Sequence, residues 1–337
     1  MRVAFVAPLV ASTCDTTSRG AHIVVADLAR SMKDRGHDVM VFCAEGSYLN
    51  GIDTAPILRD ARSDVWETLW WHVDQWDPDV VFQHGTEPEA FGPNGHPIVH
   101  TMHANPVDDG IIDAARRGHE QLVAVSRDSQ RRWRAAGMHD VRFIANAVPD
   151  FGVSLNAPDP IALIAGRIAP EKGTATAIRA AKRAGLEPVV VGEVCDRLYF
   201  AREIVPLLDH VRVMRTIPRQ RVWALMSRAA VTLMPIEWEE PFGLVAAEAQ
   251  AAGCPVVGYA RGALPEVVPQ GEGGILVAPG DEDALASAIP MARCMERVAI
   301  REQARDRFDF DLMADSYEEL LAEAATGMTH HSEAAAA

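Results

Sequence analysis

Four charged residues stand at positions where a phosphate group and sugar hydroxyls could be bound together. Arg167 and Lys172 follow a short apolar run, whereas Glu240 precedes a helix-like segment and Glu248 lies inside it. Arginine and lysine hold phosphate oxygens. Carboxylates accept hydrogen bonds from hydroxyl groups, and such charge-assisted bonds are roughly twice as strong as neutral ones. A ligand that carries both phosphates and hydroxyls, such as a sugar nucleotide, would satisfy all four side chains.

The two glutamates belong to a 35-residue stretch, Met234 to Val268, which predicts a strand, a bend and a helix in succession. The helix is expected over residues 244–252, and Gly253 ends it as a C-terminal glycine does. A buried strand over residues 255–259 and a loop over residues 262–265 follow. A glycine bend before a helix leaves free backbone amides at the positive end of the helix dipole, which favours an anion there.

Each of these residues also has a purely structural interpretation. Glu240 alone could be a loop charge, and Glu248 alone could lie on a solvated helix face. Arg167 and Lys172 could be exposed basic residues near the start of a helix, although the helix dipole disfavours cations there unless an anion joins them. His103 follows a predicted strand, where a histidine is usually a satisfied structural residue, but the carboxyl edge of a parallel sheet is also where ligands bind.

The whole stretch from Met234 to Val268 resembles the donor-site signature of the GT-B glycosyltransferases of family 4, the glycosyl transferases group 1, a large retaining family. The matching positions are Glu240, Phe242, Gly243, Leu244, Glu248, Gly253, Pro255, Val256, Val257, Gly262, Pro265, Glu266 and Val268. A second family segment is matched by Gly166, Arg167, Glu171, Lys172 and Gly173. Ala263 departs from the family, which often has a second glycine there, and alanine has less freedom than glycine to adopt a positive φ.

The resemblance implies a role for each matched side chain. Arg167 and Lys172 would stabilise the diphosphate of the donor as its negative charge grows in the transition state. Glu248 would hold ribose hydroxyls, Glu240 would hold the transferred sugar, and His103 would orient that sugar from across a cleft. The resemblance assigns further substrate contacts, in part through backbone amides, to Gly20, Gly166, Ile217, Phe242, Gly243, Leu244 and Val245.

The first half of the chain matches the family less closely. A loop of about a dozen residues follows the first predicted strand, and a loop of that length is usually functional. Ser18 and Arg19 stand beside Gly20 and could contact a glycosyl acceptor, or could simply be surface residues. Ser126 is expected to cap the helix that follows it. Asn146 stands where the family often has an Asn-Gly-Val turn, and a structural role is expected for it.

Short apolar runs alternate with helical segments along the chain, and this pattern predicts the fold class. Runs of four to seven residues without polar alternation indicate strands that are buried on both faces of a parallel sheet. The runs are residues 3–7, 39–44, 80–83, 98–102, 122–126, 141–144, 161–165, 188–191, 211–217, 231–234, 255–258 and 274–277. The sequence therefore predicts an α/β protein with two Rossmann-like, doubly wound parallel-sheet domains, and the resemblance implies that they face each other across a cleft, as in GT-B proteins.

A segment rich in Gly, Asn and Pro at residues 150–160 is the expected linker. We expect an acceptor domain over residues 1–152 and a donor domain over residues 158–307. A last helix over residues 308–326, with Leu312, Tyr317 and Leu320 on one face, is expected to cross back to the first domain. Residues 327–337 are interpreted as a tail.

Composition excludes several classes of protein. A formal charge of −15 disfavours nucleic acid and anionic membrane as partners. Five scattered cysteines without a Cys-x-x-Cys pair indicate a reduced, cytoplasmic compartment and neither a disulfide framework nor a zinc site. The apolar run at the amino terminus is too short for a signal peptide, and no run is long enough to span a membrane. The Asp-Pro-Asp at residues 77–79 and the acidic triplet at residues 281–283 are not interpreted as metal sites.

These observations and the resemblance together lead to one functional hypothesis and two alternatives. The hypothesis is a retaining, hexosyltransferase-type glycosyltransferase that moves a sugar from a nucleoside-diphosphate sugar, with UDP the favoured nucleotide, to a hydroxyl of a small-molecule or sugar-bearing acceptor. No metal or other cofactor is expected. A sugar-nucleotide epimerase of GT-B type would share the donor site and need no acceptor. A non-catalytic, two-domain sugar-binding protein is the third possibility.

Overall fold

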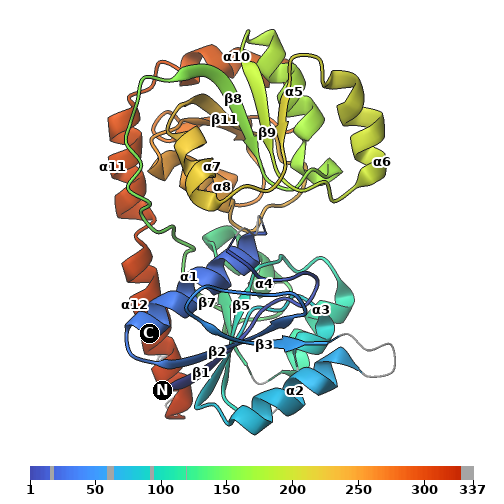
Figure 1. The fold of residues 1–337 in the computed structure, drawn as a ribbon, viewed down its shortest axis with the longest axis vertical. Coiled ribbons are helices and arrows are strands. Elements are labelled where there is room, and N and C mark those ends of the chain that lie inside the picture. Colours follow the sequence, from blue (N-terminus) through green and yellow to red (C-terminus); the bar gives the residue numbers. More distant parts are fainter. Residues whose placement is uncertain (16–18, 59–63, 92–94, 119, 328–337) are drawn as a thin grey trace, which may run out of the picture.

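The computed structural model describes residues 1–15, 19–58, 64–91, 95–118 and 120–327. Within these residues the strands form two fully parallel sheets, each flanked by helices, and the two units lie one above the other (Figure 1). The predicted fold class, two doubly wound α/β domains, is confirmed.

The first sheet has the strand order β3-β2-β1-β4-β5-β6-β7 among the described residues. Its central strand, β1, has no exposed side chain from Val3 to Val6, as expected for a strand covered on both faces. The sequence order of the strands reverses between β1 and β4, which creates a crevice at their carboxyl ends where ligands of such sheets bind. The strands are β1 (Arg2–Val6), β2 (Asp38–Ala44), β3 (Asp53–Ile57), β4 (Val80–Gln83), β5 (Ile98–Met102), β6 (Gln121–Ala124) and β7 (Arg142–Phe143).

The second sheet has the order β10-β9-β8-β11-β12-β13 within the described residues, and its order reverses between β8 and β11. A register shift interrupts the pairing of β8 with β11. The strands are β8 (Asp159–Ala165), β9 (Glu187–Val191), β10 (Arg212–Met214), β11 (Ala229–Met234), β12 (Val256–Tyr259) and β13 (Gly274–Val277). The expected strand over residues 211–217 is thus shorter than predicted, because Arg215 to Ile217 lie beyond the last pair with β9.

The helices follow the sequence pattern closely where they cover a sheet. The helix expected over residues 244–252 spans Leu244–Ala251, and Ser126 caps α4 by accepting a hydrogen bond from the amide of Ser129 at 2.9 Å, as predicted. The α-helices are α1 (Gly20–Asp34), α2 (Val65–Trp76), α3 (Asp109–Arg117), α4 (Arg127–Ala135), α5 (Thr174–Arg183), α6 (Arg197–Tyr199), α7 (Arg219–Met226), α8 (Leu244–Ala251), α9 (Leu264–Val267), α10 (Glu282–Ala292), α11 (Arg297–Arg307) and α12 (Phe310–Ala325). Shorter helical turns are η1 (Pro88–Ala90), η2 (Pro170–Lys172), η3 (Phe200–Ile204) and η4 (Val205–Leu207).

Strand β3 is an element that the apolar pattern missed. It pairs with β2 at the edge of the first sheet, and four of its five residues are exposed or half-buried. An edge strand contacts only one neighbour, so it needs no continuous apolar run, and it tolerates the proline at position 56.

The last helix, α12, packs against the first sheet although it follows the second one in sequence (Figure 1). Tyr317 is fully buried, and its hydroxyl accepts a hydrogen bond from the Thr101 hydroxyl at 3.1 Å. The prediction that Leu312 belongs to the buried face is wrong, since its side chain is 61% exposed. Five residues separate positions 312 and 317, which places them about 140° apart around a helix. Met313, four residues before Tyr317, takes the buried position instead.

Several hydrogen bonds join the first unit to the loops after β11 and β12 of the second. The carboxylate of Glu266 accepts hydrogen bonds from the backbone amides of Arg127 and Asp128, at 2.9 and 3.1 Å, at the start of α4. Arg132 donates to the carboxylate of Glu239 at 2.7 Å. The side-chain amide of Asn105 donates to the backbone carbonyl of Glu239 at 2.8 Å. The loops that carry the predicted donor residues are therefore held against the first unit.

All five cysteines are free thiols in this structure. Among the residues described, no helix combines the length and the apolar character that a membrane span requires.

Candidate active site

The amino terminus of α8 forms the centre of the site, and a glycine is required there. Gly243 precedes the helix with φ +96°, a left-handed conformation that side chains disfavour. A Cβ atom at this position would also lie 2.8 Å from a methyl carbon of Leu264. Glycine therefore allows the bend that turns the free amides of the first helical turn, including those of Leu244 and Val245, towards the carboxyl edge of the sheet. Such amides bind anions.

The two predicted cations reach the same edge from β8 and η2. Lys172 places its ammonium nitrogen 2.6 Å from a carboxylate oxygen of Glu240. Arg167 makes an ion pair of 2.9 Å with Glu171. Both cations keep partly accessible side chains, and both are balanced by a carboxylate in this structure. A bound diphosphate would compete with those carboxylates for the two cations.

Glu240 has a second partner, Trp238, that the sequence analysis did not assign to the site. The indole nitrogen of Trp238 donates to the same oxygen of Glu240 at 2.6 Å, and the ammonium of Lys172 lies 5.1 Å from the centre of the indole ring. The indole thus fixes the carboxylate, and its ring lines the cavity next to it. Its position two residues before Glu240 is the feature of the sequence that could have placed Trp238 in the site.

Two adjoining cavities bring most of the predicted site residues together. The larger, about 290 Å³, opens between the two units and is lined by Gly20, His103, Arg167, Lys172, Glu240, Phe242, Gly243 and Leu244, among others. The smaller, about 100 Å³, shares several of these residues and adds Gly166, Val245 and Glu248. Residues from both halves of the sequence thus face one hollow, with the cations, the glutamates and the α8 amides on one wall and His103 and Gly20 on the other.

His103 is held by a second histidine. Nδ1 of His84, which follows β4, lies 2.9 Å from Nε2 of His103. Burial, followed by repulsion from His100 and His22, lowers the pKa of His103 to about 3. Burial also holds the pKa of His84 well below its ordinary value. His103 therefore faces the cavity as a neutral ring, which suits a hydrogen bond to a sugar hydroxyl rather than an ionic contact with phosphate.

The loop after β12 has Ala263 where the family often has a second glycine, and its backbone does not require a glycine there. Ala263 has φ −80°, which any residue adopts, and its amide donates to the carbonyl of Glu240 at 2.8 Å. Gly262 has φ +58° and approaches the backbone of Glu240 closely. The first glycine is therefore the one that the local geometry needs.

Four other positions considered in the sequence analysis have different outcomes. Ile217 lines neither of the two cavities and packs, partly buried, against the core, so its expected contact with the base stays a prediction. Arg19 lines the larger cavity and makes an ion pair of 3.4 Å with Glu193 of the second unit. Ser18 lies outside the described residues. Asn146, for which a structural role was expected, has its side chain buried in the wall of the larger cavity.

Glu248 is 96% buried inside α8, so it is not a solvated helix charge. Its carboxylate accepts a hydrogen bond of 2.5 Å from Arg219, at the start of α7. No pattern of residue spacing in the sequence predicted that Arg219 would contact Glu248. In the described part of the chain, no three His, Cys, Asp or Glu residues are grouped so that they could hold a metal ion.

Comparison with known families agrees with this geometry. Residues 150–306 match the family model described as glycosyl transferases group 1, and residues 18–150 match the model described as glycosyltransferase family 4. The two matches meet at residue 150 and together cover every strand of both sheets that the structure describes except β1. The chain belongs to the family 4 glycosyltransferases.

Curated relatives in the family match parts of the chain. A glycogen synthase from Mycobacterium tuberculosis is 33% identical over 174 residues, which is 45% of this chain and 40% of the relative. A D-inositol 3-phosphate glycosyltransferase from Mycobacterium avium is 32% identical over 192 residues, which is 52% of this chain and 45% of the relative. The match thus spans less than half the length of each of these relatives.

Solved structures match over nearly the whole chain. Sucrose-phosphate synthase from Thermosynechococcus elongatus superposes with a TM-score of 0.79 at 19% identity, covering 97% of this chain and 99% of the other. Anabaena HepE, solved in complex with UDP-glucose, also has a TM-score of 0.79 at 18% identity, covering 96% of this chain and all of the other. These likenesses establish the shared GT-B fold.

Proposed function

We propose that the protein is a retaining glycosyltransferase that moves a hexosyl group from a nucleoside-diphosphate sugar, with UDP the favoured nucleotide, to a hydroxyl of a small-molecule or sugar-bearing acceptor. One observation carries the proposal. Arg167, Lys172 and the amino terminus of α8 converge on the same cavity as Glu240 and Glu248. Family membership and the fold shared with a UDP-glucose complex of HepE support it.

The site separates the two chemical parts of such a donor. The cations and the α8 amides would bind the diphosphate, and Glu248 would accept hydrogen bonds from ribose hydroxyls. Glu240, fixed by the indole of Trp238, would accept them from the transferred sugar, and neutral His103 would bond to that sugar from the opposite wall. Lys172 would exchange its contact with Glu240 for the phosphate when the donor enters.

The reaction breaks the bond between the anomeric carbon and the phosphate oxygen, and the electron pair leaves with the nucleoside diphosphate. Arg167 and Lys172 lie where that negative charge grows, and stabilisation of developing charge is usually the largest catalytic contribution. The acceptor oxygen bonds to the same face of the anomeric carbon, so the configuration is retained, and its proton passes to the departing phosphate. The two cations supply positive charge at the diphosphate, which is the basis for proposing that no metal is required.

Nucleotide binding is the first test of this proposal. We expect one of UDP, GDP, ADP and dTDP to raise the melting temperature of the wild type, because a ligand at 100 times its Kd adds about 2.7 kcal/mol of stability. Arg167→Ala should abolish the shift. Arg183→Ala, which removes an exposed arginine from α5 in the same unit, is the matched control and should keep it.

The remaining outcomes separate the alternatives. Release of the nucleoside diphosphate that requires an acceptor, resists EDTA and gives a product with the anomeric configuration of the donor supports the transferase. Conversion of the nucleotide sugar to its epimer without any acceptor would identify an epimerase. No response to any of the four nucleotides would overturn the donor site and favour a sugar-binding protein.

A further inference from the structure

Arg219 lies in the contact between the two units, and the proposed reaction assigns it no role. It is the first residue of α7, and its side chain is only 12% exposed. The amino terminus of a helix is unfavourable for a cation because the helix dipole is positive there. A guanidinium also costs several kcal/mol to remove from water unless anions accompany it. Its position therefore requires strong partners.

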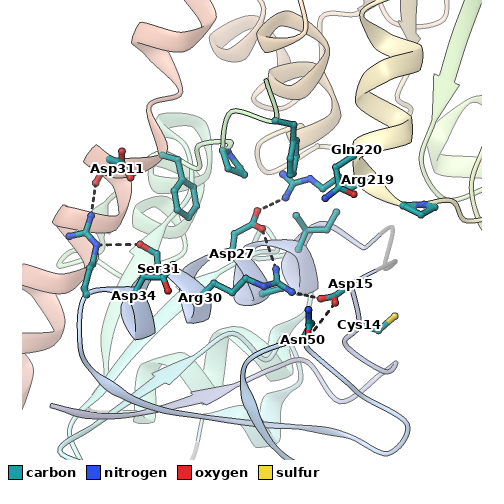
Figure 2. Close-up of a pocket in the computed structure, with 17 residues that line it drawn as sticks. Cys14, Asp15, Asp27, Arg30, Ser31, Asp34, Asn50, Arg219, Gln220 and Asp311 are labelled. Atoms are coloured by element: carbon teal, nitrogen blue, oxygen red, sulfur yellow. Dashed lines mark hydrogen bonds and ion pairs between the residues drawn. The ribbon is translucent and has the colours of Figure 1, made fainter. Parts of the chain in front are cut away.

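Two carboxylates from different units provide those partners. Nε of Arg219 donates to Oε1 of Glu248 on α8 at 2.5 Å. Its Nη1 donates to Oδ2 of Asp27, which belongs to α1 of the first unit, and Figure 2 shows these two side chains pointing towards each other. Burial lowers the pKa of Arg219, but the carboxylates of Glu248 and Asp27 outweigh it and raise the pKa above its ordinary value. The arginine is therefore a permanent cation between two anions.

Asp27 is itself held in place on α1. Its other oxygen, Oδ1, lies 4.0 Å from Nη1 of Arg30, and Arg30 also forms an ion pair with Asp15 (Figure 2). Asp27 and Arg219 line a cavity of about 850 Å³, whereas Glu248 lines the small donor cavity. The row of alternating charges thus runs from the first unit to the carboxylate proposed to bind ribose.

The consequence for Glu248 is geometric. A glutamate side chain has three rotatable bonds, and Arg219 removes this freedom by holding one carboxylate oxygen. With Oε1 taken by the guanidinium, Oε2 is the oxygen available to a ligand hydroxyl in the donor cavity. Hydrogen bonds from hydroxyl groups to a carboxylate are charge-assisted, and these are the stronger kind.

We propose that Arg219, anchored by Asp27 of the opposite unit, is a positioning residue that aims the carboxylate of Glu248 at the ribose hydroxyls of the nucleotide. This inference rests on the proposed function. It makes ribose recognition a property of both units, since a residue of the first unit completes a contact made in the second. Removal of Asp27, which lies outside the donor cavity, should therefore impair the recognition of ribose in particular.

The test compares nucleotides with and without the two ribose hydroxyls. UDP, GDP and ADP and their 2′,3′-dideoxy counterparts are titrated calorimetrically into the wild type. We expect the ribose form of the preferred base to bind about 10- to 100-fold more tightly than its dideoxy form, the range for hydrogen bonds to a charged group. Arg219→Met and Asp27→Ala should reduce this ratio to nearly one, mostly by weakening the ribose form.

Further variants keep the test decisive. Arg219→Met with Asp27→Asn keeps the net charge unchanged and does not leave Asp27 as an unpaired anion, so it serves if Arg219→Met alone does not fold. It should lose the same discrimination between ribose and dideoxy nucleotides. Arg219→Lys should keep part of the ratio of ribose to dideoxy affinity that Arg219→Met loses. Arg221→Met, an exposed arginine on the same helix, is the control and should keep the wild-type ratio.

The possible failures are distinguishable. Equal weakening of ribose and dideoxy forms in Arg219→Met and in the double variant would assign Arg219 a structural role only and overturn the inference, while the proposed function would stand. No binding of any diphosphate to the wild type would overturn the proposed function, and this inference with it.

Discussion

Replacement of Gly262 by alanine tests how the loop after β12 supports Glu240, the glutamate proposed to bind the transferred sugar. Gly262 has φ +58°, and a Cβ atom built on it would lie 2.4 Å from the backbone nitrogen and 2.5 Å from the backbone oxygen of Glu240. These are main-chain atoms, so no side-chain rotation can relieve the contact. The loop, the backbone of Glu240 or both must move.

The magnitude follows from two separate costs. A left-handed conformation costs a residue with a Cβ atom about 1–2 kcal/mol. Forcing an extra methyl group into a packed site costs about 1–3 kcal/mol more. The free energy of unfolding should therefore fall by about 2–5 kcal/mol. Because the moving backbone belongs to Glu240, and because the amide of Ala263 donates to its carbonyl at 2.8 Å, binding of the sugar nucleotide should weaken as well.

Gly185 provides the matched control. It lies in the same unit with φ +69°, but no atom lies within 4 Å of its built Cβ. Gly185→Ala should therefore show only the conformational cost of about 1–2 kcal/mol and unchanged nucleotide-sugar binding. Urea unfolding followed by tryptophan fluorescence, together with calorimetric titration of the donor, measures both effects. Equal destabilisation by the two substitutions would refute the steric argument, and unchanged donor binding in Gly262→Ala would refute its link to Glu240.

Three further predictions concern other parts of the structure. The pKa of His103 is about 3 in the fold against 6.5 in the unfolded chain, so only the unfolded state binds this proton at intermediate pH. Stability should then fall by up to about 1.4 kcal/mol per unit as the pH drops from 6.5 towards 4, and urea titrations should show a shallower fall in His103→Asn. Tyr317→Phe should lower the free energy of unfolding by about 1–3 kcal/mol, because the buried Thr101 hydroxyl loses its acceptor. Adding Thr101→Val should recover part of that stability. If the double variant instead loses as much again as Thr101→Val alone, the pairing is contradicted. Glu266→Ala should cost about 0.5–2 kcal/mol by freeing two amides at the start of α4, and it should increase the radius of gyration in solution scattering, whereas the exposed Glu272→Ala should change neither quantity.

Local patterns in the sequence were enough to predict most strands of both sheets and most residues of the wall that is proposed to bind the donor. A strand buried on both faces needs a short apolar run, and a bend before a helix needs a glycine, so β1, β11 and the start of α8 can be recognised from neighbouring residues alone. The charged residues Arg167, Lys172 and Glu240 follow strand ends, and parallel strands bring such ends to one edge. Their meeting in one cavity was therefore predictable before any distance was known.

Local patterns failed where an element packs on one side only, or where a residue distant in sequence sets which face is buried. The edge strand β3 has a single pairing partner and no continuous apolar run. The buried face of α12 depends on which side meets the first sheet, and there Met313 rather than Leu312 lies inward. Both features are set by what the element packs against.

The row of alternating charges that ends at Glu248 is the clearest case of a feature that only the tertiary structure decides. The resemblance of residues 234–268 to the family signature implied binding roles for Glu240 and Glu248. Arg219 and Asp27, in contrast, stand 192 residues apart and follow no shared pattern. Ion pairs between distant residues carry no periodicity, because neither partner needs particular neighbours in sequence. The sequence alone indicated which groups are candidates for binding a nucleotide sugar. Only the tertiary packing, of α7 beside α8 and of one unit against the other, decided how Glu248 is held.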